Sequence, residues 1–288
     1  MEGLILAILA AFCWGSSGVV YKKGLEEVSE LYGNMVRSIV ASLLFLPILI
    51  FGSYIFELVS IDMFTAFILI LSAILSFFIG DLLYLYSLKR APVSIVLPLS
   101  ATYPIYVVLL SQVIYSVRFN LNLLIASLLT VIAVYAISRS VRKNADNKIK
   151  SLKGIYFALL AAFFWSLAIL TLDYLTTKLS VVTVAGVRMM FNAAILIIIV
   201  SGFEGFKINS NAIKYLGIGG GILTFAGIYS FIEAVHLVGS WKVTPITASS
   251  PVIGALLGKI SLKEKIDIAT AISILLVVLG VILVSLTK

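Results

Sequence analysis

The chain has 288 residues, of which 61% are hydrophobic and only 12% are charged, with a mean hydropathy of +1.16. Soluble domains carry roughly 25% charged residues, so this composition predicts a lipid bilayer rather than water as the solvent. One cysteine and one histidine, Cys13 and His236, exclude an internal disulfide and a structural zinc site. The net charge of +8 is spread between apolar runs, which favours control of membrane topology over nucleic-acid binding.

Apolar runs long enough to cross a membrane follow one another along the whole chain. About 20 apolar residues span the hydrocarbon core as a helix. The first run begins at Gly3 without the basic start of a signal peptide, so we expect it to be retained as the first membrane helix. The predicted spans, ten in all, are 3–21, 31–51, 64–87, 93–116, 119–138, 153–172, 181–201, 212–237, 240–259 and 266–286.

The longest polar stretch lies almost at the midpoint of the chain. Residues 138–153 hold six basic side chains and separate five predicted spans from five others. We therefore predict a first five-helix repeat over 1–140, a basic connecting loop over 141–152, and a second five-helix repeat over 153–288.

The two halves also repeat each other residue by residue. Trp14 recurs as Trp165 and Arg37 as Arg188, both at an offset of 151 (165 − 14 and 188 − 37). Because five is odd, the second repeat must enter the membrane inverted relative to the first, which is a recurrent transporter architecture. At an offset of 147 (245 − 98), a glycine and two prolines recur: Gly80, Pro98 and Pro104 as Gly227, Pro245 and Pro251.

Basic residues are distributed unevenly between the two sets of connections. With the amino terminus outside, the inner connections carry 15 Lys and Arg residues and the outer ones carry 4. Since Lys and Arg resist translocation, this predicts a multi-pass protein of the cell membrane with both termini outside.

These motifs resemble those of the drug/metabolite transporter superfamily, specifically its EamA-type members of two five-helix repeats. The likeness covers essentially the whole chain, although Gly258-Lys259 and Ser111-Gln112 replace a Gly-Glu pair that the family often carries. It implies small organic cargo, such as amino acids, related metabolites or amphipathic drugs, commonly moved outward. Several relatives are described with both termini in the cytoplasm, against the charge count above. The residues that carry the resemblance are Trp14-Gly15-Ser16-Ser17, Arg37 and Arg188, the four recurring prolines, and Leu279-Gly280-Val281.

Four ionisable residues fall inside predicted spans, where each costs roughly 2.5–3.5 kcal/mol near the bilayer centre. Their depths predict two pairs, Arg37 with Asp81 near one membrane face and Arg188 with Glu233 near the other. One pair could loosen as the other forms, which would serve alternating access. The alternative is that each pair only neutralises buried charge and holds the helices in register.

Aromatic and hydroxyl side chains inside the spans could line a cavity for a small organic ligand. The alternative is that these side chains only pack between helices. The recurring prolines free backbone carbonyls and kink their helices, which marks candidate moving or ligand-lining segments, or else fixed bends. The predicted substrate-binding residues are Trp14, Ser17, Arg37, Asp81, Tyr84, Tyr103, Trp165, Arg188, Tyr229 and Glu233, and the predicted kink residues are Pro98, Pro104, Pro245 and Pro251.

The sequence thus predicts an all-α membrane protein that acts as a carrier of small organic metabolites. Amino acids or related compounds are the first cargo class, and exchange of anionic metabolites such as sugar phosphates or carboxylates is the alternative. Proton coupling through Asp81 or Glu233 stays open, as does monomer against homodimer. A channel would need a continuous polar pore, whereas this sequence offers paired charges and two kinked, inverted halves. An intramembrane serine protease would need Ser17 to meet His236, but their spans end on opposite sides. We expect no enzyme activity, cofactor or metal.

Overall fold

The computed structural model describes residues 1–91, 93–116, 120–144, 152–205, 209–254 and scattered positions between 256 and 283. Within these residues the regular elements are helices, and six spans are long and apolar enough to cross a membrane. The protein is therefore a multi-pass membrane protein, and the part of the chain that the structure describes is helical. The six spans are Glu2–Gly24, Glu30–Phe51, Met63–Arg90, Lys153–Lys178, Val181–Phe203 and Ser210–Val238.

The described helices fall on the predicted runs, but six of them, not ten, are long and apolar enough to cross a membrane within the described residues. The predicted span 266–286, the pair Gly258-Lys259 and most of the loop 141–152 lie largely outside the described residues. In the first half the elements are α1 (Glu2–Gly24), α2 (Glu30–Phe51), η1 (Tyr54–Leu58), α3 (Met63–Ala73), η2 (Ile74–Gly80), α4 (Asp81–Arg90), α5 (Val93–Ser100), α6 (Tyr103–Ile114) and α7 (Leu121–Asn144). In the second half they are α8 (Leu152–Lys178), α9 (Val181–Phe203), α10 (Ser210–Ala212), η3 (Ile213–Gly220), α11 (Gly221–Val238) and α12 (Ser240–Thr247).

Serine caps begin the second helix of each half. Ser29 and Ser180 each accept a hydrogen bond from the backbone N–H three residues on, at 3.0 and 3.2 Å, which satisfies a donor that the helix leaves unpaired. Each cap is also held by a glutamate of the other half. Glu57 accepts a hydrogen bond from the Ser180 backbone N–H at 2.8 Å, and the Ser29 hydroxyl donates to Glu204.

Two of the predicted spans are interrupted rather than continuous. The helix over 93–116 breaks at residues 101–102, between α5 and α6, and α12 is followed by a turn at residues 248–249 before helix resumes at residue 250. Pro104 lies in the first turn of α6, where its missing N–H costs nothing. The predicted prolines therefore flank breaks: Pro98 and Pro104 the first, Pro245 and Pro251 the second.

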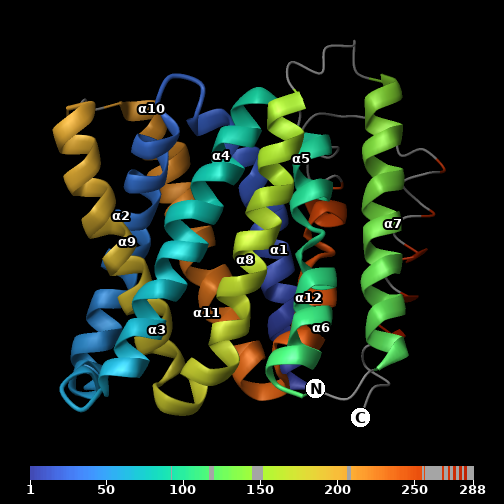
Figure 1. The fold of residues 1–288 in the computed structure, drawn as a ribbon. Coiled ribbons are helices and arrows are strands. Elements are labelled where there is room, and N and C mark those ends of the chain that lie inside the picture. The colour runs from blue at the N-terminus through green and yellow to red at the C-terminus, as the bar shows by residue number, and fades with distance from the viewer. Residues whose placement is uncertain are drawn as a thin grey trace.

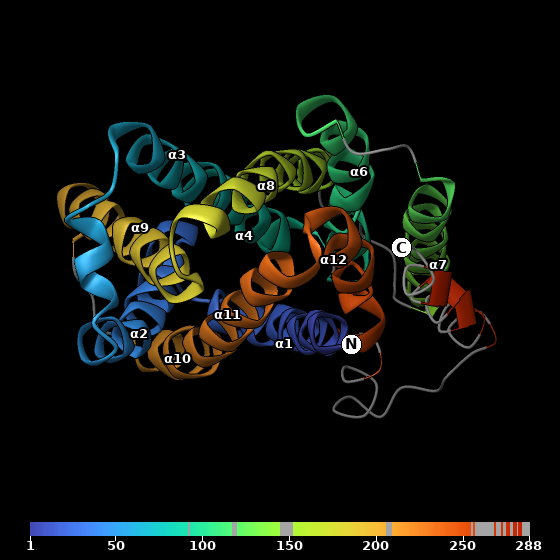
Figure 2. The ribbon, with the colours of Figure 1, turned by 90° about the horizontal axis from the view of Figure 1, so that it is seen from below.

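The two halves pack across each other. The helix α1 lies against α11, α8 against α3, η2 and α4, and α2 against α9, while α7 stands at one edge beside α5, α6 and α12 (Figures 1 and 2). In Figure 1, α1 begins at the lower edge and α8 at the upper edge. Fully buried alanines line both first helices, and small residues let membrane helices approach closely. They are Ala7, Ala10 and Ala11 in α1 and Ala158, Ala161 and Ala162 in α8.

Candidate functional site

A cavity lies between the two halves, enclosing about 910 Å³ of space with its mouth included. Its lining is mostly apolar with a few polar groups, as in sites that bind small organic ligands. Most of the predicted substrate-binding residues line it. Tyr229 and Glu233, both on α11, are not among its lining residues. Those that line the cavity are Trp14, Ser17, Arg37, Asp81, Tyr84, Tyr103, Trp165 and Arg188.

Each recurring tryptophan packs on the recurring glycine of the opposite half. A Cβ atom on Gly80 would lie 2.5 Å from Trp165 Cδ1, and one on Gly227 would lie 2.8 Å from Trp14 Nε1, so any larger residue would displace the indole. The same indoles face aromatic side chains of the opposite half. The ring centroids are 5.3 Å apart for Trp165 and Tyr84 and 4.9 Å apart for Trp14 and Phe231. The residues that reveal the repeat in the sequence therefore pack against one another between the two halves.

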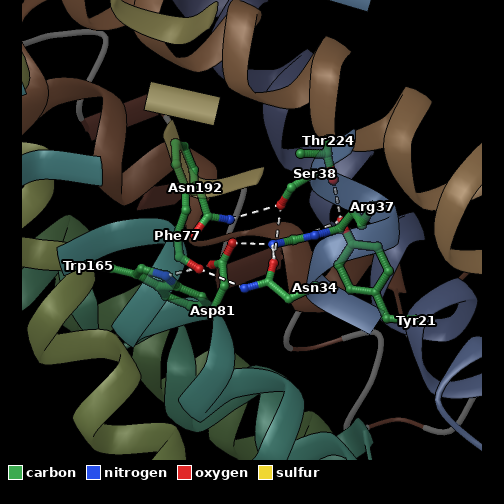
Figure 3. A network of polar contacts seen from close by, with 9 residues as sticks. All are labelled: Tyr21, Asn34, Arg37, Ser38, Phe77, Asp81, Trp165, Asn192 and Thr224. Carbon is green, nitrogen blue, oxygen red and sulfur yellow. Dashed lines mark hydrogen bonds and ion pairs between the residues drawn. The ribbon is translucent and has the colours of Figure 1, made fainter. Parts of the chain in front are cut away.

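The two terminal nitrogens of the Arg37 guanidinium donate to neighbouring side chains, while its Nε has no hydrogen-bond partner among the described residues (Figure 3). Its Nη2 donates to an oxygen of Asp81, forming an ion pair, and to Asn34 Oδ1 at 2.6 Å, while Nη1 donates to the Tyr21 hydroxyl at 3.3 Å. The indole N–H of Trp165 donates to the other Asp81 oxygen at 2.9 Å. The predicted pairing of Arg37 with Asp81 is therefore confirmed, and Trp165 from the second half completes it.

Further polar side chains extend this network, and the sequence analysis missed them. Short amides and hydroxyls in membrane helices carry no charge signal and recur widely, so only their contacts reveal them. Asn34 Nδ2 donates to the Phe77 carbonyl oxygen at 2.8 Å, Asn192 Nδ2 donates to Ser38 Oγ at 2.9 Å, and the Tyr21 and Thr224 hydroxyls lie 2.7 Å apart (Figure 3).

Arg188 lies on the same cavity without such partners, and the predicted pair of Arg188 with Glu233 is wrong. In the part of the chain that the structure describes, Arg188 makes no ion pair and no hydrogen bond, and its Nε is buried and unpaired. The side chain is only 3% exposed. Its guanidinium lies 4.8 Å from the centre of the Phe77 ring and interacts electrostatically with Asp81.

Residue type at corresponding positions explains why the two arginines differ. The offsets that relate the halves give the counterpart of each partner of Arg37, and in every case an apolar side chain replaces a hydrogen-bonding one. Arg188 is thus buried where its own half offers no acceptor. The counterparts of Tyr21, Asn34 and Asp81 are Leu172, Ala185 and Ile228.

The two helix breaks meet beside the cavity. The Tyr103 hydroxyl, at the start of α6, lies 2.7 Å from the Thr247 hydroxyl, at the end of α12. Ser17 donates its hydroxyl to the Trp14 carbonyl oxygen at 2.8 Å, within its own helix, and His236 is exposed near the end of α11. Among the described residues, no three His, Cys, Asp or Glu side chains are grouped as a metal site.

Fold and cavity together define a class: a polytopic helical membrane protein with a buried, partly charged chamber between two cross-packed halves. Comparison with known proteins identifies the family within this class. The EamA-like transporter family model matches residues 1–139 and 152–286. A protein of Archaeoglobus fulgidus named "Uncharacterized transporter" is 41% identical over 285 residues, covering 98% of both chains. The chain belongs to the EamA-like transporter family.

Two more distant matches also extend over nearly the whole chain. Protein LicB of Haemophilus influenzae is 25% identical over 288 residues, covering 98% of this chain and 97% of its own. A crystal structure that is 15% identical superposes with a TM-score of 0.78 over 99% of both chains, which establishes the shared fold.

Proposed function

We propose that this protein is a secondary transporter that carries small organic metabolites across the cell membrane by alternating access. In this proposal ten membrane helices form two inverted five-helix repeats, over 1–140 and 153–288, joined by the basic loop 141–152. The cargo is an amino acid or a related compound, and the direction is outward. Membership of a transporter family supports the coarser part of this proposal.

Three features support inversion of the repeats. The helices α1 and α8 start at opposite edges of the bundle (Figure 1). Each first helix packs against the third span of the other half. The glutamate contacts to Ser29 and Ser180 link α2 and α9 reciprocally, as a two-fold relation between the halves would. The excess of basic residues on one set of connections supports both termini outside.

The observation that carries the proposal is that corresponding positions of the two halves line one cavity. An inverted-repeat carrier alternates by exchanging the conformations of its halves around a fixed central site, so its substrate must contact matched positions of both. The interrupted helices also border this cavity, as in carriers whose broken helices line the site. The matched lining positions are Trp14 and Trp165, Tyr21 and Leu172, Arg37 and Arg188, Phe77 and Thr224, Asp81 and Ile228, Tyr84 and Phe231, and Tyr103 and Ser250.

Proton coupling, if it operates, has one candidate on the cavity wall. Asp81 is the carboxylate among the lining residues, whereas Glu233 is not one of them. The second candidate function, exchange of anionic metabolites, is favoured by the unpaired Arg188, which offers a positive charge that no described side chain neutralises by direct contact.

Counterflow in liposomes tests the proposal. The purified protein is reconstituted with unlabelled amino acids inside, and entry of radiolabelled amino acids is followed with and without an imposed pH gradient. Protein-free liposomes and protein that has been heat-denatured are the controls. Accumulation of label identifies a carrier and its cargo, and a response to the gradient assigns coupling. Failure with amino acids, followed by counterflow with carboxylates or sugar phosphates, would replace the first cargo class with the second. If folded protein shows no counterflow of amino acids, carboxylates or sugar phosphates, the proposal that it is a carrier is overturned.

A further inference from the structure

We propose that Arg188 binds the carboxylate of the substrate, and that the cavity therefore selects organic monocarboxylates with an apolar or aromatic body. This inference rests on the proposed function and assigns the chemistry of the cargo at the same cavity. Free carboxylic acids and amino acids share the group in question, and the experiment below separates them.

The surroundings of Arg188 are costly for a charged side chain. A guanidinium carries five N–H donors and stays charged, so it requires acceptors wherever it is removed from water. Arg188 is 97% buried, being 3% exposed, yet it has no hydrogen bond or ion pair within the described residues. Burial of an unpaired charge is strongly unfavourable. A side chain retained at such a cost, on the wall of a cavity, is suited to receive its acceptor from a ligand.

Asp81 does not act as that acceptor in this conformation. Its oxygens receive the Trp165 indole N–H and the Arg37 guanidinium, and no hydrogen bond or ion pair joins Asp81 to Arg188. Asp81 contributes only a longer-range electrostatic attraction to Arg188. The cavity thus holds two arginines and one carboxylate, which leaves a single positive charge for the ligand to match.

The surroundings of Arg188 also indicate the charge and shape of the ligand. A carboxylate fits the guanidinium fork with two parallel hydrogen bonds, and one negative charge matches the one unbalanced positive charge. A phosphate ester would bring nearly two negative charges. The ring of Phe77 lies beside Arg188, and further apolar side chains continue the wall, so the body of the ligand should be apolar. These are Ile169, Leu172, Ile228, Phe231 and Ile232.

A binding experiment with matched probes tests this inference apart from transport. Trp14 and Trp165 line the cavity, and W241F removes the third tryptophan of the chain, so intrinsic fluorescence reports occupancy. The probes share a phenyl ring: 3-phenylpropionate, L-phenylalanine, L-phenylalanine amide, phenethylamine and phenyl phosphate. We expect the two carboxylates to bind and the amide and amine to bind at least 10-fold more weakly. Binding of L-phenylalanine but not 3-phenylpropionate would identify the cargo as an amino acid. Binding of 3-phenylpropionate but not L-phenylalanine would identify it as a free carboxylic acid.

The variants R188Q and R188K decide the role of the arginine. R188Q should weaken carboxylate binding at least 10-fold and abolish the preference for the carboxylate over the amide. R188K keeps the positive charge but not the forked guanidinium, so it should retain part of that preference. Equal binding of carboxylate and amide, tightest binding of phenyl phosphate, or unchanged binding by R188Q would overturn the inference. So would no binding of any probe by folded protein.

Thermal stability separates a ligand-binding arginine from a structural one. If Arg188 only held helices together, R188M would lower the melting midpoint. If it is an uncompensated charge awaiting a ligand, R188M should raise the midpoint of the unliganded protein by about 2 °C or more, with R37M as the matched control that lowers it. Counterflow with the wider set of metabolites is then run separately. Transport without carboxylate preference would overturn only this inference, whereas selective binding without any counterflow would overturn the proposed function.

Discussion

The indole N–H of Trp165 donates a hydrogen bond to Asp81 at 2.9 Å, joining the first helix of one half to the third span of the other. The same carboxylate is the ion-pair partner of Arg37. Asp81 therefore links both halves at the cavity wall, and a change at this residue should affect packing and transport together.

Replacing Asp81 by asparagine should be strongly destabilising. D81N leaves the Arg37 charge buried without its counter-charge, and losing one partner of such a pair costs about 3–5 kcal/mol. We expect a lower melting midpoint and the loss of most counterflow. E233Q is the matched control, because Glu233 is not among the cavity-lining residues, and it should transport like the unaltered protein. Full transport by D81N would show that the pair has no part in the transport cycle.

The two tryptophans allow a sharper test of the hydrogen bond itself. W165F keeps an aromatic ring against Gly80 but removes the donor to Asp81, which should cost about 1.5–3 kcal/mol because the acceptor is charged. W14F, at the matched position, should cost less, since no hydrogen bond of the Trp14 indole is formed among the described residues. Thermal melts of both variants measure the difference. Equal costs would contradict a specific role for the Trp165 bond.

Adding one methyl group at the recurring glycines should displace the indoles. The Cβ of G80A would lie 2.5 Å from Trp165, and that of G227A 2.8 Å from Trp14, so each should destabilise by about 1–3 kcal/mol and shift tryptophan fluorescence. G202A in α9 is the control, because its Cβ would have nothing within 4 Å and alanine favours helix. Tolerance of G80A equal to that of G202A would mean that the indoles are not held as described.

The hydroxyl contact between Tyr103 and Thr247 couples the two broken helices. Y103F and T247V should each cost about 1 kcal/mol, and the double variant should cost less than their sum, since both remove the same bond. If the contact opens during transport, Y103F should also change the counterflow rate while binding of the cargo is retained. Strict additivity of the melting free energies would count against the bond.

One carboxylate outside the membrane spans gives a pH prediction. Asp62 caps α3 by accepting from the Thr65 backbone N–H at 3.0 Å and from its hydroxyl, and these hydrogen bonds lower the pKa of Asp62 below its ordinary 3.8. A lowered pKa means that its contribution to stability is present above pH 3.8 and is lost as the pH falls through the folded value. Melting midpoints of D62N should therefore fall less between pH 5 and pH 3 than those of the unaltered protein. Parallel curves would contradict the cap.

Part of the cavity could be read from the sequence because its residues are unusual for a membrane helix. A charged side chain deep in an apolar span is costly in lipid and a tryptophan there is bulky, so both are expected to face the protein interior. Depth along antiparallel helices then paired Arg37 with Asp81 correctly. The same argument paired Arg188 with Glu233 wrongly. Depth gives the level of a residue in the membrane but not the face of the helix on which it lies. Glu233 is not among the lining residues, although its neighbours Phe231 and Ile232 are.

Hydropathy and repetition are properties of the chain alone, so the sequence is enough to predict the membrane environment, the positions of the apolar helices and the recurrence of particular residues. Which of the repeated residues meet depends on how the two halves pack. The tryptophans recur at one offset and the glycines at another, and it is the crossing of the two halves that packs Trp165 on Gly80 and Trp14 on Gly227. The same crossing buries two arginines beside a single carboxylate. The charge that remains unpaired on Arg188 is a consequence of side-chain geometry in three dimensions.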